Sequence, residues 1–421
     1  MTMEKKRKVL ETQLPSVVPS VKISRRRMLG GAAALGLVLV QDSFGKIIQE
    51  AQPLFDVPKD PTKRLGVPPG ILGTRSPYEQ PGKLPSLTSS RTPLQDLFGT
   101  ITPADLHFER NHGGVPAIDP TNYELVIHGM VEKAMRFTLH DLKRFPSFTR
   151  TCFIECSGNF RSGNTNLSPQ EICGLTSQSE WTGVMLSTLF REVGADSKAT
   201  WFLAEGNDAA VMTRSIPMAK AYEDAMLVYA QNGEALRPEQ GYPVRLLLPG
   251  WEGNTQVKWI RRIEIADQPF MTREETSKYT ENIAGGKIRQ FSFLMDARSI
   301  ITFPSYPLQI EKGWVEIRGI AWTGRGKITQ VEVSTDEGRN WKQAVLQEPV
   351  LSKAHTAFRL LWYWDGRQTI IKSRAIDETG YYQPSYQELV TARESKGGYH
   401  FNPITAWEVK KDGTIWLVND R

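Results

Sequence analysis

The last third of the chain alternates apolar and polar residues in short runs with a period of two. The pattern is clearest in three runs, at residues 314–318, 328–333 and 371–375. The second and third runs lead into turns that end in glycine, at Gly338 and Gly380. A period of two buries one face of a strand and leaves the other in solvent. Residues 291–421 are therefore predicted to form a β-sandwich.

The preceding stretch, residues 101–290, mixes strand patterns with helical ones. Short apolar runs bounded by turn residues predict strands at 123–129, 151–156, 200–203 and 244–248. Helices are predicted over Leu139–Phe145, with Thr138 as N-cap, and over Met185–Val193. The 34 glycines and 26 prolines of the chain favour loops and short strands. This stretch is predicted to be an α+β domain.

Residues 46–100 hold nine prolines among polar residues. Proline lacks a backbone donor and fixes its own backbone angle, which disfavours helices and central strands. This stretch is therefore predicted to be an extended arm that lies on the folded body.

Residues 1–45 are predicted to be a signal region. Consecutive arginines at 25–27 precede the apolar run 30–40, which is too short for a bilayer, since a span takes about 20 residues. A basic segment before a short apolar run indicates a secretory signal, and paired arginines indicate the twin-arginine route. We expect a periplasmic protein without membrane attachment after processing. An uncleaved N-terminal anchor helix is the alternative.

The formal net charge of +6 comes from this region. Of the 52 basic and 46 acidic residues, eight bases and two acids lie in residues 1–27. The rest of the chain is balanced, so it exerts no general attraction on a phosphate backbone. No nucleic-acid partner is predicted.

Three cysteines are present, Cys152, Cys156 and Cys173. An odd number leaves at least one thiol unpaired, and a chain of 421 residues needs no disulfide scaffold. The sequence lacks the glycine fingerprint of dinucleotide binding, the haem-attachment motif and the paired cysteines of iron–sulfur proteins. A redox function would therefore need a different cofactor.

Cys156 opens the Gly/Asn-rich segment 156–163, directly after a predicted strand. This position places a thiol at the edge of a cleft. Arg161 is predicted to lower the pKa of the thiol and to favour the thiolate. A thiolate is a soft ligand for a redox metal. From these residues alone, a buried structural cysteine is the alternative.

Two further segments group cations with polar residues. Arg-Asn-His at 110–112 offers donors for a phosphate or another anion, with a plain polar loop as the alternative. Within 241–259, Arg245 and Lys258 lie beside a strongly apolar strand, where a charge needs a partner. A structural ion pair and a bound anion both meet that need.

The order and spacing of the three segments resembles the sulfite oxidase family of molybdopterin enzymes. The matching parts are Arg-Asn-His at 110–112, Cys-x-Gly-Asn-x-Arg at 156–161, and Gly-x-Pro-Val-Arg followed by Val-Lys-Trp within 241–259. The resemblance covers roughly residues 100–421. It implies an α+β fold in which a sulfite-oxidase-type molybdopterin domain precedes an immunoglobulin-like, dimer-forming β-sandwich. It also implies a molybdenum–molybdopterin cofactor and oxygen-atom transfer.

The resemblance further implies roles for single residues. Cys156 would be the thiolate ligand of molybdenum. The implied cofactor-binding residues are Phe108, Arg110, Asn111, His112, Cys156, Arg245 and Lys258. The implied catalytic residues, which would bind the anionic substrate or relay a proton, are Arg110, Arg161, Tyr279 and Arg393.

Some residues depart from the pattern of typical sulfite oxidases. Gln240 stands where a histidine is frequent, Glu109 stands where a neutral residue is usual, and residues 173–176 lack a tryptophan. This implies a substrate other than free sulfite. Residues 399–402 are similar to the sulfane dehydrogenases of thiosulfate-oxidising Sox systems.

That similarity implies the molybdenum subunit of such an enzyme. It would oxidise sulfane sulfur carried on a cysteine of a carrier protein and pass electrons to a dihaem c-type cytochrome subunit. A homodimer of this chain would then lie within a heterotetramer. A periplasmic sulfite dehydrogenase is the first alternative. An exported, non-enzymatic binding protein with a structural Cys156 is the second.

Overall fold

The computed structural model describes residues 68–161 and 166–418. The chain divides into two compact units, Met1–Thr74 and Arg75–Arg421. The described residues of the first unit, 68–74, contain no helix or strand. All helices and strands in the described part of the chain belong to the second unit.

The predicted signal region, residues 1–45, lies outside the described residues, as do residues 46–67 of the predicted arm. Export through the twin-arginine route therefore stays a prediction. Across 68–161 and 166–418, no helix combines the length and the apolar character needed to cross a membrane.

The described part of the arm forms two strands. Strand β1 (Leu84–Pro85) pairs with β2 (Ser89–Arg91), and β2 pairs in antiparallel fashion with β3 (Glu109–Arg110). The arm therefore places Arg91 beside the segment that carries Arg110.

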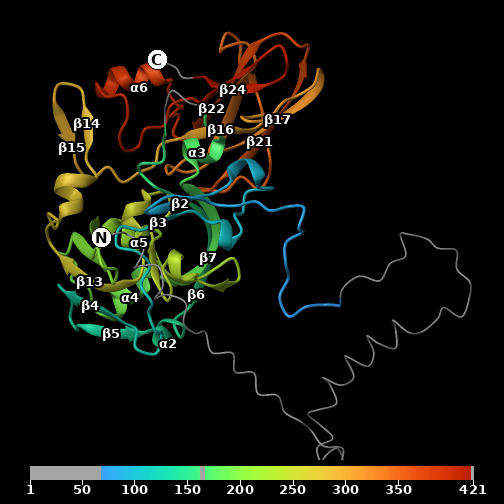
Figure 1. Ribbon diagram of the computed structural model, residues 1–421. Coiled ribbons are helices and arrows are strands. Elements are labelled where there is room, and N and C mark those ends of the chain that lie inside the picture. The colour runs from blue at the N-terminus through green and yellow to red at the C-terminus, as the bar shows by residue number, and fades with distance from the viewer. Residues whose placement is uncertain (1–67, 162–165, 419–421) are drawn as a thin grey trace, which may run out of the picture. The chain divides into compact units, whose positions relative to one another are not determined.

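Two five-stranded sheets are formed by strands β4 to β13, which precede the C-terminal sandwich (Figure 1). The first has the order β11–β10–β7–β6, with β12 on β10; its strands are β6 (Ser147–Glu155), β7 (Thr176–Met185), β10 (Met226–Gln231), β11 (Glu234–Ala235) and β12 (Arg245–Leu247). The second has the order β5–β4–β13–β8–β9; its strands are β4 (Glu124–Gly129), β5 (Met135–Thr138), β8 (Trp201–Gly206), β9 (Thr213–Pro217) and β13 (Ile260–Ala266). The hairpin of β14 (Glu281–Ile283) and β15 (Lys287–Arg289) follows.

The helices are short. The α-helices are α2 (Leu139–Leu142), α3 (Pro169–Cys173), α4 (Leu186–Glu192), α5 (Met218–Glu223) and α6 (Tyr386–Arg393). Single turns are η2 (Leu94–Asp96), η3 (Ala104–Leu106), η4 (Pro238–Gln240), η5 (Gly253–Thr255) and the π-turn η6 (Glu274–Lys278). Thr138 caps α2 as predicted, through a capping box with Asp141. The helix stops before the predicted end at Phe145, because the residue before Pro146 disfavours the α conformation.

One apolar core joins both sheets to α4. Its fully buried side chains include Ile127, Val184, Phe190, Phe202 and Ile263. Each such side chain contributes about 1.5–3 kcal/mol relative to exposure. The core therefore gives the loops at the sheet edges a rigid support.

The C-terminal part is the predicted β-sandwich (Figure 1). One sheet has the order β16–β17–β21–β20; its strands are β16 (Arg298–Phe303), β17 (Gly313–Trp322), β20 (Val345–Leu346) and β21 (Thr356–Trp364). The other has the order β19–β18–β22–β23–β24; its strands are β18 (Ile328–Ser334), β19 (Lys342–Gln343), β22 (Thr369–Asp377), β23 (Ala406–Val409) and β24 (Ile415–Val418). In β17, Val315 and Ile317 are buried, whereas Trp314 and Glu316 are exposed. The predicted alternation and the α+β class are confirmed.

The sandwich packs against the end of β6. Phe153 packs in the sandwich core. Glu155 accepts hydrogen bonds from Trp322 Nε1 (2.6 Å) and Arg298 Nη1 (3.0 Å). The turn that starts at Cys156 is therefore supported both by the sheet that contains β6 and by the sandwich.

Candidate active site

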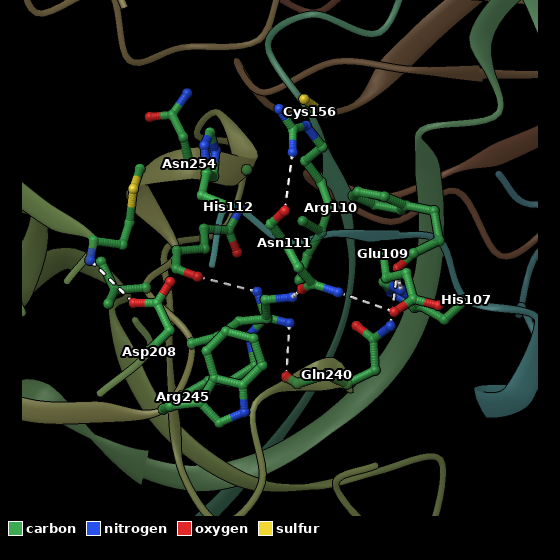
Figure 2. Close-up of a pocket in the computed structure, with 18 of the residues that line it drawn as sticks. His107, Glu109, Arg110, Asn111, His112, Cys156, Asp208, Gln240, Arg245 and Asn254 are labelled. Carbon is green, nitrogen blue, oxygen red and sulfur yellow. Dashed lines mark hydrogen bonds between the residues drawn. The ribbon is translucent and has the colours of Figure 1, made fainter. Parts of the chain in front are cut away.

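A cavity opens between β3, the turn after β6 and the loops beside β12. Its walls include eight residues singled out in the sequence: Phe108, Arg110, Asn111, His112, Cys156, Arg245, Lys258 and Tyr279. Figure 2 shows Cys156 and Arg110 toward one end, and Arg245 and Gln240 toward the other.

Cys156 begins a tight turn after β6. Its N–H donates to Leu175 O (3.0 Å) and its C=O accepts from Asn159 N (2.9 Å). Asn159 braces the turn, since its Nδ2 donates to Glu155 Oε1 (2.9 Å) and its Oδ1 accepts from Leu175 N (2.8 Å). These bonds hold the half-buried thiol at the cavity wall.

Burial raises the pKa of the Cys156 thiol, and the Gly158 N–H and the Arg110 guanidinium offset this only in part. The prediction that Arg161 favours a thiolate is therefore wrong. Arg161 is exposed, and solvent screens its charge, whereas Arg110 lines the same cavity as the thiol. A soft metal ion must displace the thiol proton when it binds.

The other end of the cavity holds two cations that face neutral acceptors. Arg245 is buried; its Nη1 donates to Gln240 O (3.0 Å) and its Nη2 to Gln256 O (3.1 Å). Lys258 Nζ donates to Asn111 Oδ1 and to a backbone carbonyl. Burial lowers the pKa of Arg245 to about 9, and burial with the nearby Arg245 charge lowers that of Lys258 to about 7. Among the described carboxylates, none forms a salt bridge with either cation.

Gly241 explains how these cations come so close. Its φ is 107°, in the left-handed region that favours glycine. A Cβ at this position would lie 3.0 Å from Arg245 Cβ and 3.1 Å from Lys258 Cβ. The glycine of the Gly-x-Pro-Val-Arg segment therefore lets the loop close over both side chains.

Three buried polar atoms beside the cavity lack a hydrogen-bond partner: Arg245 Nε, His107 Nε2 and Asn254 Oδ1. Burial lowers the pKa of His107 to about 3, so its ring is neutral. Its Nδ1 lies 3.0 Å from Phe108 O, which places the proton on Nδ1 and leaves Nε2 as an acceptor. Sequence reasoning missed His107 and Asn254, because neither shows a motif in the chain.

Tyr279 closes the cavity near Cys156. Its Oη lies 3.1 Å from His112 Nε2, and its ring lies 5.1 Å from the Arg214 guanidinium carbon. Burial raises the pKa of Tyr279, so the phenol remains protonated at neutral pH. It can donate one hydrogen bond to a ligand or to the imidazole.

Arg161 and Arg393 do not line the cavity. Arg161 is exposed just after the Cys156 turn. Arg393 Nη1 donates to Tyr399 O (2.8 Å), and the Tyr399 ring lies 3.8 Å from where a Cβ on Gly158 would be. Arg393 therefore orients the segment that packs on this turn. The catalytic roles of both arginines stay predictions.

A buried charged group lies beside the turn, and sequence reasoning did not identify it. Glu252 Oε1 accepts from Arg214 Nη1 and Nη2 (3.0 Å each), and its Oε2 lies 2.9 Å from His400 Nε2. His400 N also donates to Ser157 O (2.8 Å). These residues are far apart in the chain, so only the fold brings them together.

The cavity fits an anionic, metal-bearing group. Cations with unused donor capacity lie at one end, and a soft sulfur ligand lies at the other. In the described part of the chain, no three His, Cys, Asp or Glu side chains cluster as a metal site. Arg245 and Lys258 would hold the phosphate of such a group, and Cys156 would hold its metal.

Replacing Lys258 by methionine is expected to lower cofactor retention and to raise the thermal midpoint of cofactor-free protein. A buried ammonium costs free energy until its anion binds. The folded pKa of about 7 lies below the usual 10.5, so the unfolded state holds the extra proton between these values. Stability of the cofactor-free wild type therefore rises with pH across this window. The difference in thermal midpoint between the variant and the wild type should therefore be smaller at pH 9.5 than at pH 7. Thermal unfolding of the cofactor-free proteins measures this difference. A variant midpoint below that of the wild type at pH 7 would contradict the role of Lys258 as a cation that awaits an anion.

Two family models match the chain. The oxidoreductase molybdopterin binding domain matches residues 112–274, and the Mo-co oxidoreductase dimerisation domain matches residues 289–400. Among solved structures, the sulfane dehydrogenase SoxCD from Paracoccus pantotrophus is similar, with 41% sequence identity and a TM-score of 0.77. The match covers 89% of this chain and 99% of that chain.

Two curated relatives are more distant. An NADH nitrate reductase from Ulva prolifera is 29% identical over 66% of this chain and 36% of its own length. A mitochondrial sulfite oxidase from Drosophila melanogaster is 32% identical over 59% of this chain and 47% of its own length. The chain thus spans less than half the length of these two relatives.

Proposed function

Because the chain belongs to the sulfite oxidase family of molybdopterin oxidoreductases, whose cofactor is molybdenum–molybdopterin, we propose that it is the molybdenum subunit of a sulfane dehydrogenase. The substrate is a sulfane sulfur held on a cysteine of a carrier protein. The observation that carries the proposal is the similarity to SoxCD along almost the whole of that chain. Gln240 at the cavity wall, in place of the histidine frequent in sulfite oxidases, also favours it.

The chemistry that the bound molybdenum cofactor supplies is the two-electron oxidation of sulfur. For one oxygen the balance is R–S–S⁻ + H₂O → R–S–SO⁻ + 2 H⁺ + 2 e⁻. Cys156 would hold the metal through its sulfur, and Arg245 and Lys258 would hold the cofactor phosphate. The electrons leave to a c-type cytochrome, and the protons leave through groups at the cavity wall.

Arg110 and Tyr279 act on the substrate in this proposal. Arg110 lies on the Cys156 side of the cavity, so its guanidinium faces an anionic sulfur group bound near the thiol (Figure 2). Tyr279 holds a proton at Oη and exchanges it with His112 Nε2, which lies 3.1 Å away. The desolvated site strengthens both interactions.

Assembly follows the same proposal. The sandwich domain joins two copies of this chain, and each copy binds a dihaem cytochrome subunit, which gives a heterotetramer in the periplasm. The match to the Mo-co oxidoreductase dimerisation domain supports the homodimer. Light scattering on the chain alone and with the cytochrome would measure both steps.

The test is turnover by protein recovered from the periplasm, with its molybdenum measured in the same sample. We expect close to one molybdenum per chain and cytochrome c reduction that depends on a carrier protein with a cysteine-linked sulfane. Free sulfite should support little reduction. Strong turnover of free sulfite without a carrier would instead assign a sulfite dehydrogenase, and protein without molybdenum would remove the enzyme assignment.

Replacing Tyr279 by phenylalanine is expected to lower kcat about a hundredfold. The variant removes only Oη and its hydrogen bond to His112, and a positioned group that moves a proton typically contributes about 10²–10⁴-fold. Steady-state kinetics per molybdenum measures the effect. As a control, Tyr222→Phe changes a tyrosine that is 47% exposed and should leave kcat unchanged. An unaltered kcat in Tyr279→Phe would exclude the proton role.

A further inference from the structure

Arg91 comes from the arm and ends β2. The register pairs Ser89 of this strand with Arg110 of β3. Thr92 N donates to Gly174 O (2.8 Å), and a Cβ built on Gly174 would lie 3.0 Å from Arg91 Cβ. The backbone therefore fixes Arg91 against the segment that contains Gly174.

That segment, residues 172–175, also supports the Cys156 turn. The carbonyl of its first residue accepts from Arg161 N (2.9 Å), and the carbonyl of its last residue accepts from Cys156 N (3.0 Å). Arg91, Arg161 and Cys156 therefore flank the same four residues. Electrostatic interactions of Arg91 with both the Cys156 thiol and the Arg161 guanidinium agree with this placement.

These arginines form no salt bridge with a carboxylate of the described residues, and Glu171 acts on Arg91 only through a longer-range electrostatic interaction. Among the described residues, no salt bridge involves Arg91, Arg110 or Arg161, and Arg91 Nη1 is buried without a hydrogen-bond partner. Arg298, also near this segment, is by contrast paired with Glu155 (3.0 Å).

Like charges at a partly buried place repel unless an anion lies between them. Burial lowers the pKa of Arg91, and Arg161 lowers it further, while Cys173 acts in the opposite direction. An anion bound near Cys156 would relieve both effects. The planar guanidinium fork binds two oxygens of one anion at a time, which suits an oxyanion better than a single negative atom.

We propose that Arg91 is a specificity-determining residue that binds a sulfur oxyanion with two or more oxygens beside Cys156. It acts with Arg110, which lines the same cavity as Cys156, and the role rests on the proposed function in that the anion is oxidised sulfur. A sulfur group gains oxygens as it is oxidised, so Arg91 binds the product side of the reaction more strongly than the sulfane.

The test uses the molybdenum-loaded enzyme and sulfate as the probe. Sulfate should inhibit turnover competitively and raise the thermal midpoint of the wild type at constant ionic strength. We expect Arg91→Gln to weaken sulfate inhibition about tenfold and to reduce the thermal shift, because a charge-assisted hydrogen bond is lost. For Arg91→Lys, sulfate inhibition and the thermal shift should lie between those of the wild type and those of Arg91→Gln. The molybdenum content of both variants should stay at the wild-type level.

Arg191→Gln is the matched control, since Arg191 is exposed on α4, away from this segment. It should leave sulfate inhibition and the thermal shift unchanged. Sulfate inhibition within twofold of the wild type in Arg91→Gln, or a wild type that does not respond to sulfate, would overturn the proposal. The thermal shift needs no turnover. It therefore tests the role of Arg91 independently of the proposed substrate. Turnover of free sulfite without a carrier would refute the carrier-bound substrate but would leave the role of Arg91 standing.

Discussion

Replacing Cys156 by serine is expected to lower turnover per chain by more than about a hundredfold while the fold persists. Serine has nearly the same shape and keeps the backbone hydrogen bonds to Leu175 O (3.0 Å) and from Asn159 N (2.9 Å). A hydroxyl is a harder ligand that ionises far less readily than a thiol. Loss of an outer partner of a metal ligand already costs 10–100-fold, so loss of the ligand atom should cost more.

Steady-state kinetics, molybdenum content and circular dichroism measure this effect together. Cys152→Ala is the matched control, since Cys152 is fully buried and lies away from the cavity wall. It should keep turnover near the wild type with a modest loss of stability. Turnover by Cys156→Ser within tenfold of the wild type would show that this sulfur does not hold the metal.

Replacing Glu252 by alanine is expected to lower the free energy of unfolding by about 3–5 kcal/mol. Glu252 is fully buried and bonds both Arg214 and His400. Arg214 would keep its salt bridge to Glu275 (2.7 Å), so the loss should lie at the lower end of this range. Burial opposes ionisation of Glu252, but the charges of Arg214 and His400 outweigh it and lower the pKa. The stability from this carboxylate is therefore present above its usual pKa of 4.5 and is lost as the pH falls through the folded value.

Denaturant unfolding at pH 7 and pH 4 measures the difference between the Glu252→Ala variant and the wild type. The difference should be large at pH 7 and smaller at pH 4. Glu223→Ala is the control, since Glu223 is 56% exposed in its salt bridge with Lys353 (2.6 Å) and should cost less than about 1 kcal/mol. If Glu252→Ala and Glu223→Ala lowered the free energy of unfolding equally, burial would add nothing to the stability of the Glu252 salt bridge.

The fold was predictable where one physical pattern dominated. Alternation in β17 and β18 gave the sandwich strands, and Thr138 with Asp141 gave the start of α2. The predicted helix Met185–Val193 contains α4 (Leu186–Glu192). The short strands of the arm were not predicted, because a two- or three-residue strand such as β2 has no period to detect.

The candidate site was predictable where residues cluster in the chain. Arg110, Asn111 and His112 adjoin one another, and all three line the cavity with Cys156. Which arginine lies beside the Cys156 thiol was not predictable from the spacing of residues in the sequence. Arg161 is five residues from Cys156 but exposed, whereas Arg110 is 46 residues away in sequence and lies beside it in the cavity.

The sequence by itself determined the family, the cofactor and the identity of the segments that surround the cavity, because those segments carry their chemistry in contiguous residues. The tertiary structure alone decided which charges have partners. Glu252 and Glu275 form salt bridges with Arg214, whereas Arg245 and Arg91 form none with a described carboxylate. Pairing depends on distance in space and on burial, and both arise only when β2, β12 and the turn after β6 pack together.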